Sequence, residues 1–192
     1  MSTSTLAPTL IRVPAVWREA ALVSMGVLFL ALSAQVAIPL PFTPVPLTGQ
    51  TFAALLVGGA YGAARSVSTL LAYLAVGVVG LPVFADGAHG MTTLLSATGG
   101  YLVGMVLAAG IVGAAAEHGW DKALLSSIAA MFAGTAVIYI IGAGWLATAL
   151  AVGPGEAFDL GVQPFVVGDL LKLALAGAVL PAAWRLIGQA RR

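Results

Sequence analysis

An acidic and a basic residue stand three positions apart inside an apolar stretch near the end of the sequence. Asp169 and Lys172 lie within residues 165–187, whose only other charged side chain is Arg185. Residues at this spacing share one face of a helix, and an ionised group at bilayer depth costs about 2.5 to 3.5 kcal/mol. We therefore expect the pair to face the interior of a helix bundle and to contact a ligand. The alternative is an intrahelical ion pair that only neutralises itself.

The depth of this pair bears on its chemistry. A helix that begins near Phe165 and rises 1.5 Å per residue places both charges about 7 to 12 Å below its outer end. A pair at the bilayer centre would favour a proton relay or alternating access, whereas a pair in the outer third favours a pocket that is loaded from outside. The sequence therefore predicts an outward-opening binding pocket.

Two polar residues follow a stiff loop that we expect to form one wall of the pocket. Residues 39–46 hold four prolines, and each proline fixes its own φ angle. Such a loop can present Thr48 and Gln50 in a fixed pose, and Gln50 carries both donors and an acceptor. The alternative is that these prolines merely keep a helix from continuing.

A second wall is expected from glycine-containing segments, because glycine lets the backbone approach a ligand closely. Asp86 and Gly87 lie in the connection 81–97, and Gly100 and Tyr101 open the next apolar run. We take these four residues as further candidate contacts. An ordinary surface loop is the alternative interpretation of the connection.

The composition decides the fold class that must position these residues. Hydrophobic residues make up 60% of the 192 residues and charged residues only 8%, against about a quarter charged in soluble domains. So few charges cannot cover a soluble surface, so most of the exterior must face lipid. We predict an all-α membrane protein with one domain over residues 1–192. Its six transmembrane helices are expected at Trp17–Ile38, Gly49–Ala64, Ser66–Gly80, Thr98–Ala116, Ala123–Leu146 and Phe165–Ile187.

The basic residues predict the orientation, because Lys and Arg accumulate in cytoplasmic loops. Under the six-span prediction, seven of the eight basic residues fall on one side, and the three opposite loops hold only acidic charges. Both termini are therefore expected to be cytoplasmic in a multi-pass protein of the cell (inner) membrane, with residues 1–16 as a cytoplasmic tail. The seven residues are Arg12, Arg18, Arg65, Lys122, Arg185, Arg191 and Arg192.

Several function classes lack their signatures. The sequence has no phosphate-binding loop, no zinc-protease motif and no nucleophile elbow. It has no cysteine for thiolate chemistry and no basic stripe for nucleic acid. We therefore predict neither an enzyme nor a cofactor, and a chain that cannot by itself use ATP.

Four motifs resemble one known family. Residues 44–52 (PVPLTGQTF), 80–84 (GLPVF), 99–102 (GGYL) and 168–172 (GDLLK) are similar, in this order, to the biotin-specific substrate-capture subunit, the BioY family, of energy-coupling factor vitamin transporters. The resemblance implies a six-helix bundle of the S-component type that binds biotin. It also implies partners, namely a transmembrane coupling protein and ATPase subunits. Asp169 and Lys172 match the family positions that bind the polar ring of the ligand.

Three alternatives to a biotin-capture subunit stay open. The chain could instead be a capture subunit for another vitamin, a small self-sufficient transporter that couples protons through Asp169 and Lys172, or a scaffold without a ligand. Residues 86–90 (DGAHG) hold fewer glycines than the family usually has there, and no Lys or Arg lies in an outer loop to hold the biotin carboxylate.

Overall fold

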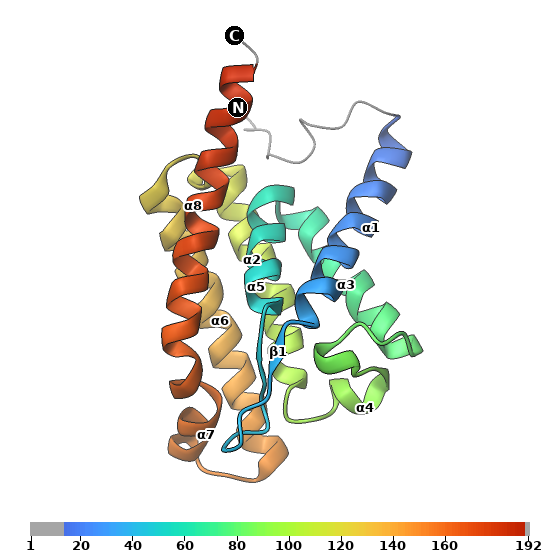
Figure 1. The fold of residues 1–192 in the computed structure, drawn as a ribbon, viewed down its shortest axis with the longest axis vertical. Helices are drawn as coiled ribbons and strands as arrows, with labels where there is room; N and C mark the ends of the chain where they lie inside the picture. The colour runs from blue at the N-terminus through green and yellow to red at the C-terminus, as the bar shows by residue number, and fades with distance from the viewer. Residues whose placement is uncertain (1–13, 191–192) are drawn as a thin grey trace.

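The structure is a computed structural model that describes residues 14–190. Long helices stand side by side in one bundle, and α1 begins at the same end at which α8 finishes (Figure 1). Arg12, Arg191, Arg192 and most of the predicted tail 1–16 lie outside the described residues. The long helices are α1 Ala15–Ala34, α2 Gln50–Tyr61, α3 Ala63–Val79, α5 Gly99–Glu117, α6 Leu124–Leu150 and α8 Val166–Ala190.

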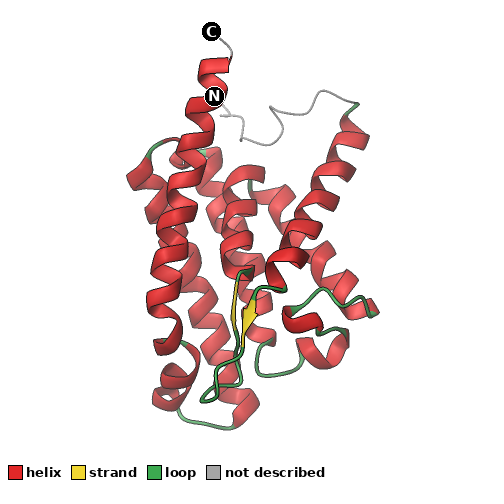
Figure 2. Cartoon of the chain, in the orientation of Figure 1, coloured by secondary structure: helices red, strands yellow, loops and turns green. Residues whose placement is uncertain are grey.

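The predicted boundaries miss by up to four residues: the fifth span ends at Leu150 rather than at Leu146, and the first ends at Ala34 rather than at Ile38. The chain then enters a short hairpin in which β1 (Ala37–Ile38) pairs antiparallel with β2 (Leu47–Thr48). The proline-rich loop joins the two strands and projects toward the lower end of the bundle in the view of Figure 2. The fold is therefore mostly helical rather than strictly all-α.

Short helical elements occupy the connections that the sequence left without structure. At the end of the bundle that holds the hairpin loop lie α4 (Gly90–Leu94) and α7 (Pro154–Gly161) (Figure 1). The described part of the chain also holds three 3₁₀ turns, namely η2 Ala85–Gly87, η3 Trp120–Lys122 and η4 Gln163–Phe165. Elements of three to eight residues leave almost no periodic pattern in a sequence, which is why they were not predicted.

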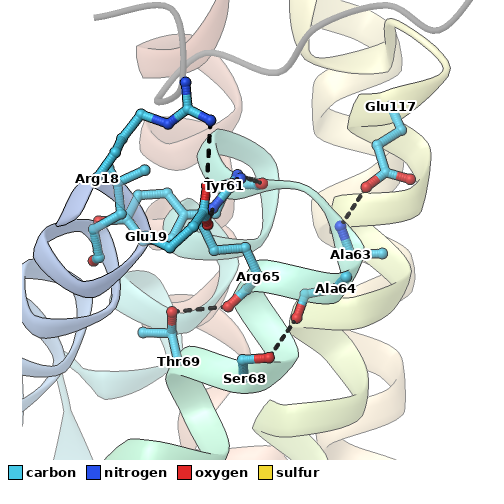
Figure 3. A network of polar contacts seen from close by, with 10 residues as sticks. Arg18, Glu19, Tyr61, Ala63, Ala64, Arg65, Ser68, Thr69 and Glu117 are labelled. Carbon is cyan, nitrogen blue, oxygen red and sulfur yellow. Dashed lines mark hydrogen bonds and ion pairs between the residues drawn. The ribbon is translucent and has the colours of Figure 1, made fainter. Parts of the chain in front are cut away.

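Helices α2 and α3 are separated by one residue, as are the expected spans Gly49–Ala64 and Ser66–Gly80, but the break lies at Gly62 rather than at Arg65. Gly62 has φ 83° and ψ 168°, a conformation that favours glycine. The N–H of Ala63, which begins α3, donates to the Glu117 carboxylate at 2.8 Å (Figure 3). The start of α3 therefore has one of its free N–H groups satisfied from the end of α5.

Helix α5 lies at the centre and packs against α2, α3 and α6. Close contact depends on glycine at several points, because a Cβ at Gly58 would meet the backbone of Ala109 and one at Gly104 would meet the backbone of Ile138. Small residues at such contacts are typical of helix packing in membranes.

Burial along α8 shows which side of the helix faces outward. Val167 and Leu171 are 81% and 64% exposed, whereas Asp169 between them is 6% exposed. An apolar exterior around a buried charge suits a lipid surface and not a water surface. Among residues 14–190, four stretches are long and apolar enough to cross a membrane, namely Val16–Ala34, Gly99–Glu117, Leu124–Leu150 and Pro154–Leu186. The shorter α3 is also apolar, with 17 residues.

Candidate ligand-binding site

A cavity of about 400 Å³ lies at the end of the bundle that holds the hairpin loop, α4 and α7. Its walls come from residues 44–51, residues 84–98, the start of α5, the middle of α6 and the start of α8. Ligand pockets for small molecules typically measure about 300 to 1,000 Å³. The space therefore suits a small organic molecule.

The charged pair predicted from the sequence lies in the wall of this cavity. Lys172 Nζ donates to Asp169 Oδ1 at 2.8 Å, and the hydroxyl of Tyr139 on α6 donates to Asp169 Oδ2 at 2.7 Å. Lys172 Nζ also donates to the Thr48 carbonyl at 2.7 Å and contacts Thr51 Oγ1 at 3.3 Å. The pair thus connects α8 to α6, to β2 and to α2, and both charges are partnered as burial requires.

This arrangement offers a ligand an anion and a cation side by side. Each Asp169 oxygen accepts one bond from the protein, and a carboxylate oxygen has two lone pairs. A ligand N–H can therefore bind to the carboxylate. A ligand carbonyl can accept from the Lys172 ammonium by replacing its longest contact, the one to Thr51 Oγ1 at 3.3 Å. Charge-assisted hydrogen bonds of this kind are about twice as strong as neutral ones.

Gln50 lies beside this pair at the start of α2 and is 5% exposed. Its Nε2 donates to the hydroxyl of Tyr73 at 2.5 Å, and the Thr48 hydroxyl contacts its Oε1 at 3.4 Å. The loop before it is held in place, because the Thr43 hydroxyl donates to the Leu160 carbonyl at 2.7 Å. The expectation of a fixed pose for Gln50 agrees with these contacts.

The rest of the cavity wall is apolar or carries hydroxyl groups. Apolar side chains come from Val45, Leu47, Phe84, Leu102, Met105, Ile138 and Phe165, and hydroxyls come from Thr92, Thr93, Ser96 and Thr98. Within residues 14–190, no three His, Asp or Glu side chains come close enough together to hold a metal ion.

Five of the eight predicted contact residues line this one cavity, namely Thr48, Gln50, Tyr101, Asp169 and Lys172. The structure therefore brings together residues that are up to 124 positions apart in the sequence. Tyr101 is held by its hydroxyl, which donates to the Gly161 carbonyl at 2.8 Å. Whether these residues bind a ligand stays a prediction.

The other three predicted contacts are not among the lining residues of this cavity. Asp86 is exposed and has φ 55°, and Gly87 beside it has φ 71°. Gly100 is buried, and a Cβ there would meet the side chain of Trp145 and the backbone of Ile141. Because Gly100 has no side chain, α5 and α6 can pack closely at this point. Ligand contact by these three residues stays a prediction without support from the geometry.

The sequence interpretation missed Tyr139, Tyr73 and Thr51, which complete the polar wall. Tyr139 and Thr51 line the cavity, and Tyr73 lies behind Gln50 with no exposed surface. A signal was available, because a buried tyrosine hydroxyl normally finds a hydrogen-bond partner. Both tyrosines stand inside predicted membrane spans, where polar partners are few.

Comparisons with known proteins find relatives that are named as biotin transporters or probable biotin transporters. The chain is 37% identical over 159 residues to a probable biotin transporter BioY of Pyrococcus horikoshii, covering 83% of this chain and 91% of the relative. It is 34% identical over 157 residues to a biotin transporter BioY of Rhizobium etli, covering 78% and 83% of the two chains.

The fold is similar to a crystal structure of the S-component for biotin from an ECF-type ABC transporter. The TM-score is 0.78 over 91% of this chain and 95% of the other, with 20% sequence identity. At that identity the likeness shows the fold alone. The sequence model of the BioY family matches residues 3–189. The chain therefore belongs to the BioY family.

Proposed function

We propose that this chain is the biotin-binding transmembrane subunit of an energy-coupling factor transporter and captures biotin from the outer face of the cell membrane. The observation that carries the proposal is the cavity of about 400 Å³ whose wall holds the Asp169–Lys172 pair. Family membership supports it, because two relatives with at least 34% identity are named as biotin transporters or probable ones.

The chemistry of biotin fits the two kinds of wall. Its ureido ring has two N–H donors and one carbonyl, which match the Asp169 carboxylate and the Lys172 ammonium. Its apolar ring and valeryl chain match the apolar wall around Phe84, Met105 and Ile138. The carboxylate end then faces the hydroxyl groups of Thr92, Thr93, Ser96 and Thr98, since Lys172 is the one basic residue among the lining residues.

The proposal includes six membrane spans in a single domain over residues 1–192, with both termini in the cytoplasm. The described basic residues support this orientation. Arg65 binds Glu19 near the start of α1, and Lys122 lies 5.0 Å from the centre of the Trp184 ring near the end of α8. Figure 1 shows that α1 begins at the end of the bundle at which α8 finishes, opposite the hairpin loop, so both contacts lie toward one end, as the positive-inside rule requires.

Labelling from outside tests the orientation. The chain has no cysteine, so single cysteines can be placed at Ala88, at Val162 and at Ala64 beside Arg65. We expect an impermeant thiol reagent to label the first two from outside intact cells and the third only after permeabilisation. Labelling of the third site in intact cells would contradict the proposed topology.

Reconstitution tests the function. We expect the purified chain to bind biotin without ATP and to accumulate it in liposomes only with a coupling protein and ATPase subunits. Concentrative uptake by the chain alone under a proton gradient would instead establish a self-sufficient transporter. Binding of another vitamin in preference to biotin would change the substrate and keep the class.

A further inference from the structure

Tyr73 has a polar contact on either side of its hydroxyl although none of its surface is exposed. The hydroxyl lies 2.8 Å from the Val83 carbonyl and 2.5 Å from Gln50 Nε2. Its ring packs edge-on against Phe84 at 5.5 Å between centroids. Tyr73 is not among the lining residues of the cavity, but Gln50 and Phe84 both are.

The Val83 carbonyl, which can only accept, determines the direction of both hydrogen bonds of the Tyr73 hydroxyl. The single hydrogen of the Tyr73 hydroxyl therefore goes to Val83, and the hydroxyl oxygen is left as an acceptor. Gln50 must then turn its NH₂ group toward Tyr73. This orientation follows from the chemistry of the partners and does not depend on telling nitrogen from oxygen in the amide.

The orientation of the Gln50 amide also determines where its oxygen, Oε1, lies relative to the cavity. With Nε2 held by Tyr73, Gln50 Oε1 is held on the side of Thr48, whose hydroxyl contacts it at 3.4 Å. That distance exceeds the usual range for an O–H···O bond. The oxygen keeps acceptor capacity at a residue that lines the cavity.

We propose that Tyr73 is a positioning residue for ligand recognition. It fixes the Gln50 amide so that Oε1 serves as a second acceptor, beside the Asp169 carboxylate, for an N–H donor of the ligand. This inference rests on the proposed function. It assigns to Gln50 Oε1 a role in specificity, namely the recognition of ligands that carry an N–H group. A ligand lacking an N–H group would leave this buried acceptor unpaired, at a cost in affinity.

A double-mutant cycle tests this role, with the variants Tyr73→Phe, Gln50→Ala and the two combined. The probe is biotin, and its Kd is measured in detergent for the complete chain. We expect Tyr73→Phe alone to raise Kd about 3- to 10-fold, the loss of one neutral hydrogen bond. In the Gln50→Ala background the same change should have almost no further effect, because Tyr73 acts through Gln50.

The matched control is Tyr61→Phe. The Tyr61 hydroxyl also donates to a backbone carbonyl, that of Leu22 at 2.9 Å, and the residue is not among those that line the cavity. We expect its Kd for biotin to equal that of the parent. An effect of Tyr73→Phe that persists in full without Gln50 would overturn the proposal, since it would show that the bond to Val83 alone matters.

A second measurement needs no ligand. The same cycle followed by thermal unfolding should show that the losses from Tyr73→Phe and Gln50→Ala are not additive, because each change removes the same hydrogen bond. Additive losses would overturn the inferred contact, also for variants that unfold too easily for binding studies. A parent chain that shows this coupling but does not bind biotin would contradict the proposed function and keep the amide orientation.

Discussion

The two ends of the helix bundle each hold an ion pair, but the two pairs have different surroundings. At the cavity end, Asp169 and Lys172 belong to one helix, and 8% of the Asp169 side chain is exposed. At the opposite end, Arg65 of α3 holds Glu19 of α1 through two bonds of 2.5 and 2.9 Å, and 42% of the Glu19 side chain is exposed (Figure 3). The pair at the helix ends, whose carboxylate is open to solvent, ties α1 to α3, whereas the buried pair lies in the wall of a cavity, where we propose that it contacts a ligand.

The two ends also differ in how tightly they are packed. Near the basic end, Trp184 Nε1 donates to Asp121 Oδ2 at 2.5 Å, and Lys122 stacks on the Trp184 ring. The void beside Asp121 has no room for a water-sized molecule. The cavity end, by contrast, leaves about 400 Å³ open. Among the described residues, the bundle is thus tightly packed around Asp121, whereas the other end holds a cavity large enough for a ligand.

The largest effect is expected from removing one charge of the cavity pair. Asp169→Asn and Lys172→Ala should each weaken biotin binding by about 2 to 5 kcal/mol, the range for breaking a buried charge-assisted pair. Titration calorimetry in detergent measures this change. Thermal unfolding of each variant serves as the control, because loss of the lysine also leaves an uncompensated carboxylate. A folded variant with the affinity of the parent would remove that residue from the site.

A smaller effect should separate packing from ligand contact at Gly100. The side chain in Gly100→Ala must displace Trp145, and such overpacking typically costs about 1 to 3 kcal/mol of stability. We expect a lower unfolding midpoint and an unchanged Kd for the folded protein. A weaker Kd with an unchanged midpoint would instead support the ligand contact that the sequence predicted.

A pH-dependent effect is expected at the basic end. Burial raises the pKa of the Asp121 carboxyl above its ordinary 3.8, although the bond from Trp184 opposes this shift. An acid whose pKa is raised by folding favours the folded state only while it is protonated. The parent should therefore lose stability relative to Asp121→Asn as the pH rises from the ordinary pKa of 3.8 to the raised pKa of the folded state. Above the raised pKa the difference in stability should stay constant.

Unfolding midpoints of the two proteins over a pH series measure this difference. The matched control is Asp159→Asn, because the pKa shift of Asp121 arises from burial and Asp159 is exposed. Parallel curves for the parent and Asp121→Asn would contradict the buried, destabilised carboxyl.

The smallest effect is expected from the Arg65–Glu19 pair, because 42% of the Glu19 side chain is exposed. Glu19→Gln should lower the free energy of unfolding by about 0 to 1 kcal/mol, as measured for other exposed ion pairs, and should leave biotin binding unchanged. Added salt should reduce the difference between this variant and the parent. A clear loss of biotin affinity in Glu19→Gln would break the comparison between the two ends.

The sequence predicted what depends on neighbours along the chain. Long apolar runs gave all six long helices to within a few residues, and the three-residue spacing of Asp169 and Lys172 placed them on one helix face. The hairpin was not predictable in the same way, because strands of two residues carry no alternating pattern.

The rest of the site depends on contacts between distant parts of the chain. Tyr139 contacts a residue 30 positions away, and the Tyr73 hydroxyl joins residues on either side of it that are 23 and 10 positions away. Gly100 has its role only because Trp145 packs against it. No spacing in the sequence encodes these partners, so their chemistry was visible only after the helices had been placed.

The most direct test of the central claim removes both charges of the cavity pair at once. In the variant Asp169→Asn with Lys172→Met no uncompensated charge remains, and such a replacement of a buried pair is often tolerated by the fold. Equilibrium binding of labelled biotin to the purified parent and to this variant gives the answer. We expect the parent to bind biotin and the folded variant to lose most of that affinity. A variant that folds, stays in the membrane and binds biotin as tightly as the parent would contradict the site.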